Sequence, residues 1–406
     1  MKFSNSNYLY ILFAICFISG MLGATVSTLM PAYLPEVLKE LRGNVNGIEL
    51  DHAAALINSM FLFGWMFGGF LWGLFCDHYG RKKSLVYSSL LYGLSAVLIS
   101  FSTSWEWVLV YLFIAGFGVG GVIVITTIFI SEVWTPANRS VAIGLLTVCF
   151  PIGIFLSGAI TSFIHDWRIA FMIGIVPLLL SFIALWILNE PDHVLSPIDN
   201  KPFYQNIRAL FNDSNRKNVL IGTITFGTML IGLWAVFAWL PTWIQSLLGV
   251  VDGQTARGLA MMSLAFAALF GSACSGWISK LLGLRQSMLL CFVVCFLCSV
   301  LLFKLTTVFS NIVYFKIGVL GFFFGISQGV LSDFISKIFP KQIRATATGF
   351  CFNAGRLFTA SAVFFVGWLV QVLGGYGNSI FMFSWVFVLG FIAAFLIKER
   401  TLTTYE

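Results

Sequence analysis

The sequence predicts an all-α membrane protein with twelve transmembrane helices in two six-helix bundles. The first observation is composition: 59% of the 406 residues are hydrophobic and only 10% are charged, whereas about a quarter of a soluble domain is charged. The second is that the apolar residues gather in twelve stretches of about the length that crosses a bilayer. The third is a long polar interval that separates the first six stretches from the last six.

The predicted spans follow one another with short polar connections. The first span is too long for a cleaved signal peptide and many others follow it, so we assign it as the first helix. In chain order the spans cover residues 9–35, 53–75, 84–101, 107–131, 141–164, 169–189, 219–247, 257–279, 287–307, 312–335, 345–372 and 379–397.

The polar interval between the sixth and seventh spans predicts the domain organisation. It begins at Glu190 and contains three prolines among its charged residues, a composition typical of a linker. We therefore expect an N-terminal bundle over residues 1–189, a cytoplasmic linker over residues 190–218 and a C-terminal bundle over residues 219–406. Residues 203–211 fit either a short interfacial helix or an ordinary linker turn.

Positive charge is distributed unevenly between the connections. With the N-terminus inside, sixteen Lys and Arg residues fall on the cytoplasmic side and five on the outside. The positive-inside rule then predicts a multi-pass protein of the cell membrane with both termini cytoplasmic. This asymmetry also explains the net charge of +7, so the lipid bilayer is an expected partner and nucleic acid is not.

The cysteines predict no disulfide framework and no metal centre. Seven of the eight cysteines fall inside predicted spans, where they serve as small hydrophobic residues. Cys291, Cys295 and Cys298 share a helical face, but no His or Asp lies nearby to complete a metal site. The sequence also lacks a phosphate-binding P-loop, so we expect no cofactor and no ATP-driven transport.

The loop after the second span carries the most informative motif. It runs Gly73-Leu-Phe-Cys-Asp77-His-Tyr-Gly80-Arg81-Lys-Lys, and its charges must mark a helix end at the lipid headgroups. Its glycines allow close helix approach and a tight turn. The pattern G-x-x-x-D-x-x-G-R-K resembles the loop between helices 2 and 3 of the major facilitator superfamily of secondary transporters. That resemblance implies a cytoplasmic gate, and the alternative is ordinary solvation of a helix end.

A second element follows the fourth span. Glu132, Pro136 and Arg139 resemble the E-x-x-x-P-x-x-R element of the sugar-porter-like, organic-ion and metabolite:proton symporter branches, which implies that Glu132 and Arg139 are gate partners. The alternative is a surface pair of about 0–1 kcal/mol. Arg344 ends a similar segment after the tenth span, where Lys337 replaces the expected acid and Asp333 could substitute for it.

Arg356 is the residue that most directly predicts a substrate. It lies about 18 Å along the eleventh span from Arg344, which is near the bilayer centre. Because an arginine costs at least about 2.5 kcal/mol at that depth, it should face a wet cavity or a partner, and no acid lies at comparable depth in any span. A guanidinium suits bidentate capture of a carboxylate, sulfonate or phosphate. The alternative is a structural role on helix carbonyls. This segment also resembles helix 11 of organic-anion and acidic-sugar transporters.

Other polar and aromatic side chains could line the same cavity. Trp239 and Trp243 flank a proline at the end of the seventh span, and we assign Trp243 to an aromatic belt at the outer interface. The glycines of the fourth span, from Gly116 to Gly121, indicate close helix packing. The cavity candidates are Asn353, Thr359, Gln328, Trp234 and Trp239.

The function predicted from these residues is alternating-access transport of a small organic anion, such as a sugar acid. The family resemblance, which extends over essentially the whole chain, implies proton-coupled import by a monomer with its substrate between two related halves. Arg356 would bind the anionic group, and Asn353 and Gln328 would orient it. The alternatives are a neutral-sugar or drug carrier of the same fold and, in another class, a receptor or scaffold that transports nothing. We predict no enzymatic activity, because no catalytic constellation lies at one membrane depth.

Overall fold

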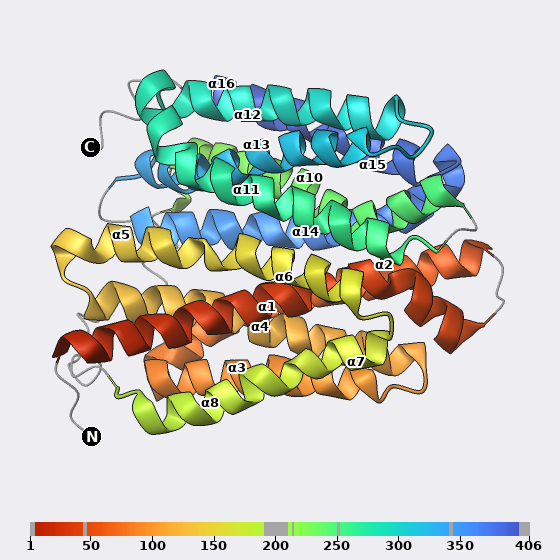
Figure 1. Ribbon diagram of the computed structural model, residues 1–406. Helices are drawn as coiled ribbons and strands as arrows, with labels where there is room; N and C mark the ends of the chain where they lie inside the picture. Colours follow the sequence, from red (N-terminus) through yellow and green to blue (C-terminus); the bar gives the residue numbers. More distant parts are fainter. Residues whose placement is uncertain are drawn as a thin grey trace. The chain divides into compact units, whose positions relative to one another are not determined.

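The computed structural model describes residues 5–43, 47–190, 210–212, 215–249, 252–340 and 344–397. Within these ranges every regular element is a helix (Figure 1), which confirms the all-α prediction. Contacts divide the chain into two compact units. Unit 1 contains Met1–Pro197 together with Gln254–Met262, and unit 2 contains Ile198–Gly253 together with Ser263–Glu406. The linker segment 203–209, where a short helix or a turn was expected, lies outside the described residues.

The helices of unit 1 cover all six spans predicted for the first half. Two of the spans are interrupted: the fifth consists of α5 and α6, and the sixth of α7, η1 and α8. The turn before α3 is made by Gly80 in the left-handed region, with φ of 92°. The elements are α1 (Asn5–Arg42), α2 (Gly47–Tyr79), α3 (Arg81–Ser100), α4 (Trp105–Val133), α5 (Pro136–Thr147), α6 (Cys149–Phe163), α7 (Trp167–Phe171), the 3-10 turn η1 (Met172–Gly174) and α8 (Ile175–Ile187).

The remaining helices cover the other six predicted spans. Glycines end two of them, because Gly249 and Gly283 adopt φ of 65° and 83°, which other residues rarely do. The elements are α10 (Arg216–Leu248), α11 (Gln254–Leu282), α12 (Leu284–Ser299), the π-helical turn η3 (Val300–Lys304), α13 (Ile312–Lys337), α14 (Arg344–Leu373), α15 (Tyr376–Ser384) and α16 (Val386–Phe395).

Among the described residues, eleven helical segments are long and apolar enough to cross a membrane. The remaining predicted span corresponds to α14, which contains Arg356. Large apolar side chains such as Phe163 and Trp186 are exposed on these helices, as expected where the surrounding solvent is lipid.

Glycine makes the closest helix contacts in unit 1, where α4 packs against α1, α2 and α3. A Cβ atom built on Gly120 would lie 2.5 Å from the carbonyl oxygen of Trp65 on α2, and one on Gly118 would lie 2.6 Å from that of Ser88 on α3. The backbone of α4 therefore lies directly against those of α2 and α3, with no side chain between them. This confirms the packing role predicted for the glycines of the fourth span.

In unit 2, glycines likewise allow close backbone contact between α11 and α13. A Cβ atom on Gly271 would meet the backbone at Phe322, and one on Gly325 would lie 2.8 Å from the backbone nitrogen of Ser272. The Ser272 hydroxyl in turn donates to the Gly325 carbonyl at 3.2 Å. The second and fourth spans of each half thus meet through glycines, in keeping with the two related halves that the family resemblance implies.

Two predictions about individual side chains have clear outcomes. All eight cysteines are free and seven of them are buried, in keeping with their expected use as small hydrophobic residues. Trp243 was expected at the membrane interface, but it is only 2% exposed and packs against Phe303 with ring centroids 5.0 Å apart. That prediction was wrong because the helix carries Trp243 on its buried side.

Candidate functional site

Arg81 forms the strongest polar contact at the α2–α3 turn. Its Nε donates to Oε2 of Glu132 at 2.8 Å and its Nη2 donates to Oε1 at 2.6 Å, which is the two-pronged geometry that guanidinium and carboxylate groups favour. Its Nη1 also donates to the Cys76 carbonyl at 3.0 Å. The Arg81 side chain is 6% exposed and that of Glu132 is 32% exposed, so the pair is partly shielded from water.

Glu190 occupies the start of α3 beside this pair. Its carboxylate accepts from the backbone N–H of Arg81 and from that of Lys82 at 3.1 Å. These donors have no partner inside the helix, and the helix dipole favours an anion there. A Cβ atom on Gly80 would collide with this carboxylate. The turn therefore needs glycine for space as well as for backbone angle.

The other residues predicted for the cytoplasmic gate are less closely connected. Glu132 pairs with Arg81, and among the described residues no ion pair joins it to Arg139, whose Nε is buried without a hydrogen-bond partner there. Gly73 has open space where a Cβ would lie, so its expected role in close packing was wrong. Asp333 binds Lys337 one turn along α13 at 3.4 Å. The side chains of Asp77 and Arg344 are not among those described.

Arg356 lies near the middle of α14. Its side chain is half-buried, and its Nη1 donates to Oδ1 of Asn353 at 3.2 Å. Asn353 is itself oriented by a bond from its Nδ2 to the Gly349 carbonyl at 3.1 Å. Since an amide carries no charge, this contact positions the guanidinium without neutralising it. The structure thus brings together the two residues that we expected to act on one anion.

The remaining cavity candidates are spread over unit 2. Thr359 is 1% exposed, and its hydroxyl donates to the Gly355 carbonyl of its own helix at 2.9 Å. Gln328 on α13 is exposed. Trp234 and Trp239 on α10 are both buried, with Trp239 5.7 Å from the ring of Tyr376. The hydrogen bonds described for Thr359 and for Arg356 go to different residues, so the place of these four side chains at one site stays a prediction.

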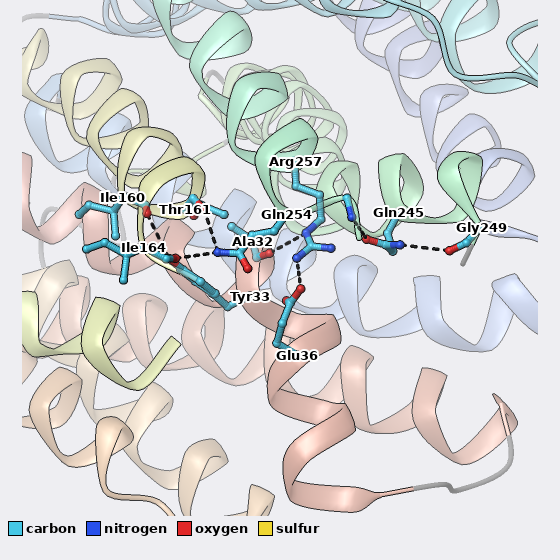
Figure 2. Close-up of polar contacts among 11 residues, drawn as sticks. Ala32, Tyr33, Glu36, Ile160, Thr161, Ile164, Gln245, Gly249, Gln254 and Arg257 are labelled. Atoms are coloured by element: carbon cyan, nitrogen blue, oxygen red, sulfur yellow. Dashed lines mark hydrogen bonds and ion pairs between the residues drawn. The ribbon is translucent and has the colours of Figure 1, made fainter. Parts of the chain in front are cut away.

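A second charged pair, absent from the sequence analysis, lies in unit 1 between α1 and the start of α11. Arg257 is 0% exposed, and it donates through Nη2 to Oε1 of Glu36 and through Nε to the Ala32 carbonyl at 3.1 Å. Figure 2 shows the guanidinium between these two acceptors. The Glu36 side chain is 27% exposed, so the acid is the more open partner.

Two side chains beside this pair cap the carboxyl end of α6 (Figure 2). The hydroxyl of Tyr33 donates to the Ile164 carbonyl at 2.6 Å. The amide Nε2 of Gln254 donates to the Thr161 and Ile164 carbonyls at 2.9 and 2.6 Å. These carbonyls have no partner within the helix, so α1 and α11 both hold the end of α6.

Sequence reasoning missed the Glu36–Arg257 pair because it placed Glu36 just after one predicted span and Arg257 at the very start of another. The first span was expected to end at residue 35, but α1 continues to Arg42 through Pro31 and Pro35. The span that begins at residue 257 likewise starts earlier, at Gln254. The usable signal was a lone acid immediately after an apolar run and a lone arginine immediately before another.

Comparison with a family model agrees with the motifs. Residues 12–362 match the model described as Major Facilitator Superfamily. The match covers most of both halves and includes the α2–α3 turn, Glu132 and Arg356. Among the described residues no cluster of His, Cys, Asp or Glu could hold a metal ion.

Several characterised and solved proteins are similar to the chain. A cis,cis-muconate transport protein from Acinetobacter baylyi is 26% identical over 86% of this chain and 86% of its own length. A benzoate transport protein from the same organism is 25% identical over 86% of this chain and 82% of its own. The solved xylose transporter XylE from E. coli matches the fold with a TM-score of 0.78 at 17% identity, over 98% of this chain and 100% of that one.

Proposed function

Because the chain belongs to the Major Facilitator Superfamily and is a transporter of that family, we propose that it carries a small organic anion across the membrane by alternating access. The substrate class is a carboxylate metabolite, which includes aromatic and dienoic acids as well as sugar acids. Proton-coupled import, cytoplasmic termini and a place in the cell membrane complete the proposal. The transporters of muconate and benzoate to which the chain is similar support the anionic class.

The observation that carries the proposal is Arg356 in the middle of α14. A guanidinium that is half-buried in a membrane-spanning helix is costly unless polar protein groups, water or a ligand solvate it. Asn353 holds it from one side at 3.2 Å. A carboxylate arriving from the cavity could accept two parallel hydrogen bonds from the guanidinium, and Asn353 could share the binding of that carboxylate.

Flux through the purified full-length protein tests the proposal. We expect liposomes that contain the protein to accumulate labelled cis,cis-muconate or benzoate, and Arg356→Gln to abolish uptake. Arg356→Lys should retain partial uptake, since it keeps the charge but loses the planar fork. Benzamide or glucose in excess should not compete. Equal competition by benzamide or glucose, or unchanged benzoate uptake by Arg356→Gln, would overturn the anion assignment.

Coupling to protons has its own measurement. With an acidic exterior and a neutral interior, uptake should exceed the level reached without a gradient, and a protonophore should abolish the excess. Because benzoic acid also crosses lipid in its neutral form, protein-free liposomes under the same gradient are the control. Uptake that is equal with and without the gradient would show an exchanger or uniporter instead.

A further inference from the structure

We propose that Phe352 determines which acids the Arg356 site accepts, because its ring gives the flat body of an aromatic or conjugated acid a surface to stack on. This inference rests on the proposed function and narrows its substrate class from carboxylates in general to planar ones. It starts from a pair of rings near Arg356. Phe352 of α14 stacks on Phe226 of α10, with ring centroids 4.1 Å apart and ring planes 12° from parallel.

The stacked pair lies one helical turn from Arg356. Residues four apart lie on the same side of a helix, so Phe352 and Arg356 project from one side of α14. The Nη1 of Arg356 donates to Oδ1 of Asn353 at 3.2 Å, which shows that its side chain runs back toward the turn that carries Phe352. The ring and the guanidinium are therefore neighbours on that side of the helix.

Close contact between α10 and α14 holds the pair in place. A Cβ atom on Gly227 would lie 3.3 Å from the Cα of Gly355, and one on Gly355 would lie 2.5 Å from Cδ1 of Phe226. The two glycines thus let the helix backbones approach each other, and Phe226 fills the space beside the residue that precedes Arg356. Rings held between packed helices lose little conformational freedom when a ligand binds.

The two rings differ in exposure. Phe226 is 5% exposed, whereas Phe352 is partly exposed. Phe226 therefore supports one face of the Phe352 ring, and Phe352 keeps surface that another planar group can contact. Because aromatic rings favour offset-stacked or edge-to-face contacts with other π systems, the preferred ligand has a flat conjugated body attached to the carboxylate that binds Arg356.

The polar side chains on this side of α14 are already engaged within the helix. The hydroxyl of Thr359 donates to a backbone carbonyl of its own helix at 2.9 Å, and the amide of Asn353 bonds the Gly349 carbonyl and Arg356. Sugar hydroxyl groups laid against Phe352 would lose hydrogen bonds to water without replacement, which is unfavourable. The same ring that suits a planar acid therefore selects against a sugar acid.

Equilibrium binding of two matched acids to the purified full-length protein tests this inference. Benzoate and cyclohexanecarboxylate are both ionised at about pH 7.5, and they share a carbon skeleton but differ in whether the ring is flat. The saturated ring is at least as apolar, so burial alone gives no preference for benzoate. We expect the protein to bind benzoate about fivefold more tightly than cyclohexanecarboxylate.

Variants of one side chain assign this preference to Phe352. Phe352→Leu should reduce the ratio of the two affinities to about one, because leucine is apolar but does not stack, and should keep the affinity for cyclohexanecarboxylate within about twofold. That retained affinity also shows that the variant is folded. Phe352→Tyr keeps the ring and should keep the preference. So should the control Phe358→Leu, because Phe358 is 57% exposed on the same helix and does not face Arg356, two residues away.

The outcomes separate this inference from the proposed function. Equal affinity of the unchanged protein for the two acids would overturn the inference and leave the proposed function standing. A preference for benzoate that persists in Phe352→Leu would do the same, because the stacked ring would then have only a packing role. Binding of neither acid would overturn the proposed function together with the inference.

Discussion

Arg81 and Glu132 join the α2–α3 turn to the end of α4 by two parallel hydrogen bonds of 2.8 and 2.6 Å. The two residues are separated by fifty others in sequence, and they lie in the two motifs that pointed most clearly to the family. The guanidinium of Arg81, in the loop motif, bonds directly to the carboxylate of Glu132, in the second motif. Glu190, which follows α8, accepts a hydrogen bond from the backbone at the start of α3. These residues form one connected charge network within unit 1.

We predict that Glu132→Gln destabilises the protein by about 1–3 kcal/mol, because it removes the carboxylate charge that bonds the 6% exposed Arg81. Arg81→Gln should have a similar effect. The double variant should cost less than the sum of the two, since each single change already breaks the pair. Thermal unfolding of the four proteins in detergent measures this. Strict additivity would show that the contact contributes nothing to stability.

Two glycines of the loop motif should respond oppositely to alanine. Gly80→Ala is expected to destabilise the protein by about 1–3 kcal/mol, because its φ of 92° is strained for alanine and the new methyl group meets the Glu190 carboxylate. Gly73→Ala should be neutral or slightly stabilising, because its surroundings are open and alanine favours a helix. Thermal stability of both variants decides this. Equal losses would contradict the account of the turn.

The backbone contact between α2 and α4 should be sensitive to a single methyl group. Gly120→Ala is predicted to lower stability by about 1–3 kcal/mol, because a Cβ there would lie 2.5 Å from the Trp65 carbonyl oxygen and 2.8 Å from the Gly69 nitrogen. Gly144→Ala on α5 is the matched control, with nothing described within 4 Å of its Cβ. A Gly120→Ala protein as stable as the control would show that the helices separate at no cost.

Thr359 should contribute little to substrate binding despite its position one turn from Arg356. Its hydroxyl is buried and donates to the Gly355 carbonyl, so Thr359→Val removes a local bond and keeps the shape. We expect its affinity for benzoate to stay within about threefold of the original. Isothermal titration measures the change, and a loss of tenfold or more would place this hydroxyl in the binding site.

The fold was largely predictable because a helix that crosses a membrane needs about twenty consecutive, mostly apolar residues. Each of the twelve predicted spans corresponds to one to three helical segments, and the errors lie at the ends. The first span was predicted to end at residue 35, yet α1 continues to Arg42 with Pro31 and Pro35 inside it. Breaks such as that between α5 and α6 leave hydropathy unchanged, so sequence pattern does not reveal them.

The candidate site was less predictable because contacts between distant helices decide which side chains meet. Local spacing correctly brought Arg356 and Asn353 together, as they lie one turn apart on α14. The family resemblance implied that Glu132 and the nearby Arg139 are partners, whereas the fold gives Glu132 to Arg81 on another helix. The Glu36–Arg257 pair joins residues more than two hundred positions apart, which no local pattern could indicate.

The most direct test of the central claim is equilibrium binding of benzoate and benzamide to the purified protein and to Arg356→Gln. The two ligands have nearly the same shape and differ in charge. If Arg356 binds the anionic group, the unchanged protein should prefer benzoate by tenfold or more, and Arg356→Gln should lose this preference while keeping its thermal stability without ligand. Equal binding of both ligands to both proteins would contradict the claim and leave Arg356 with a structural role.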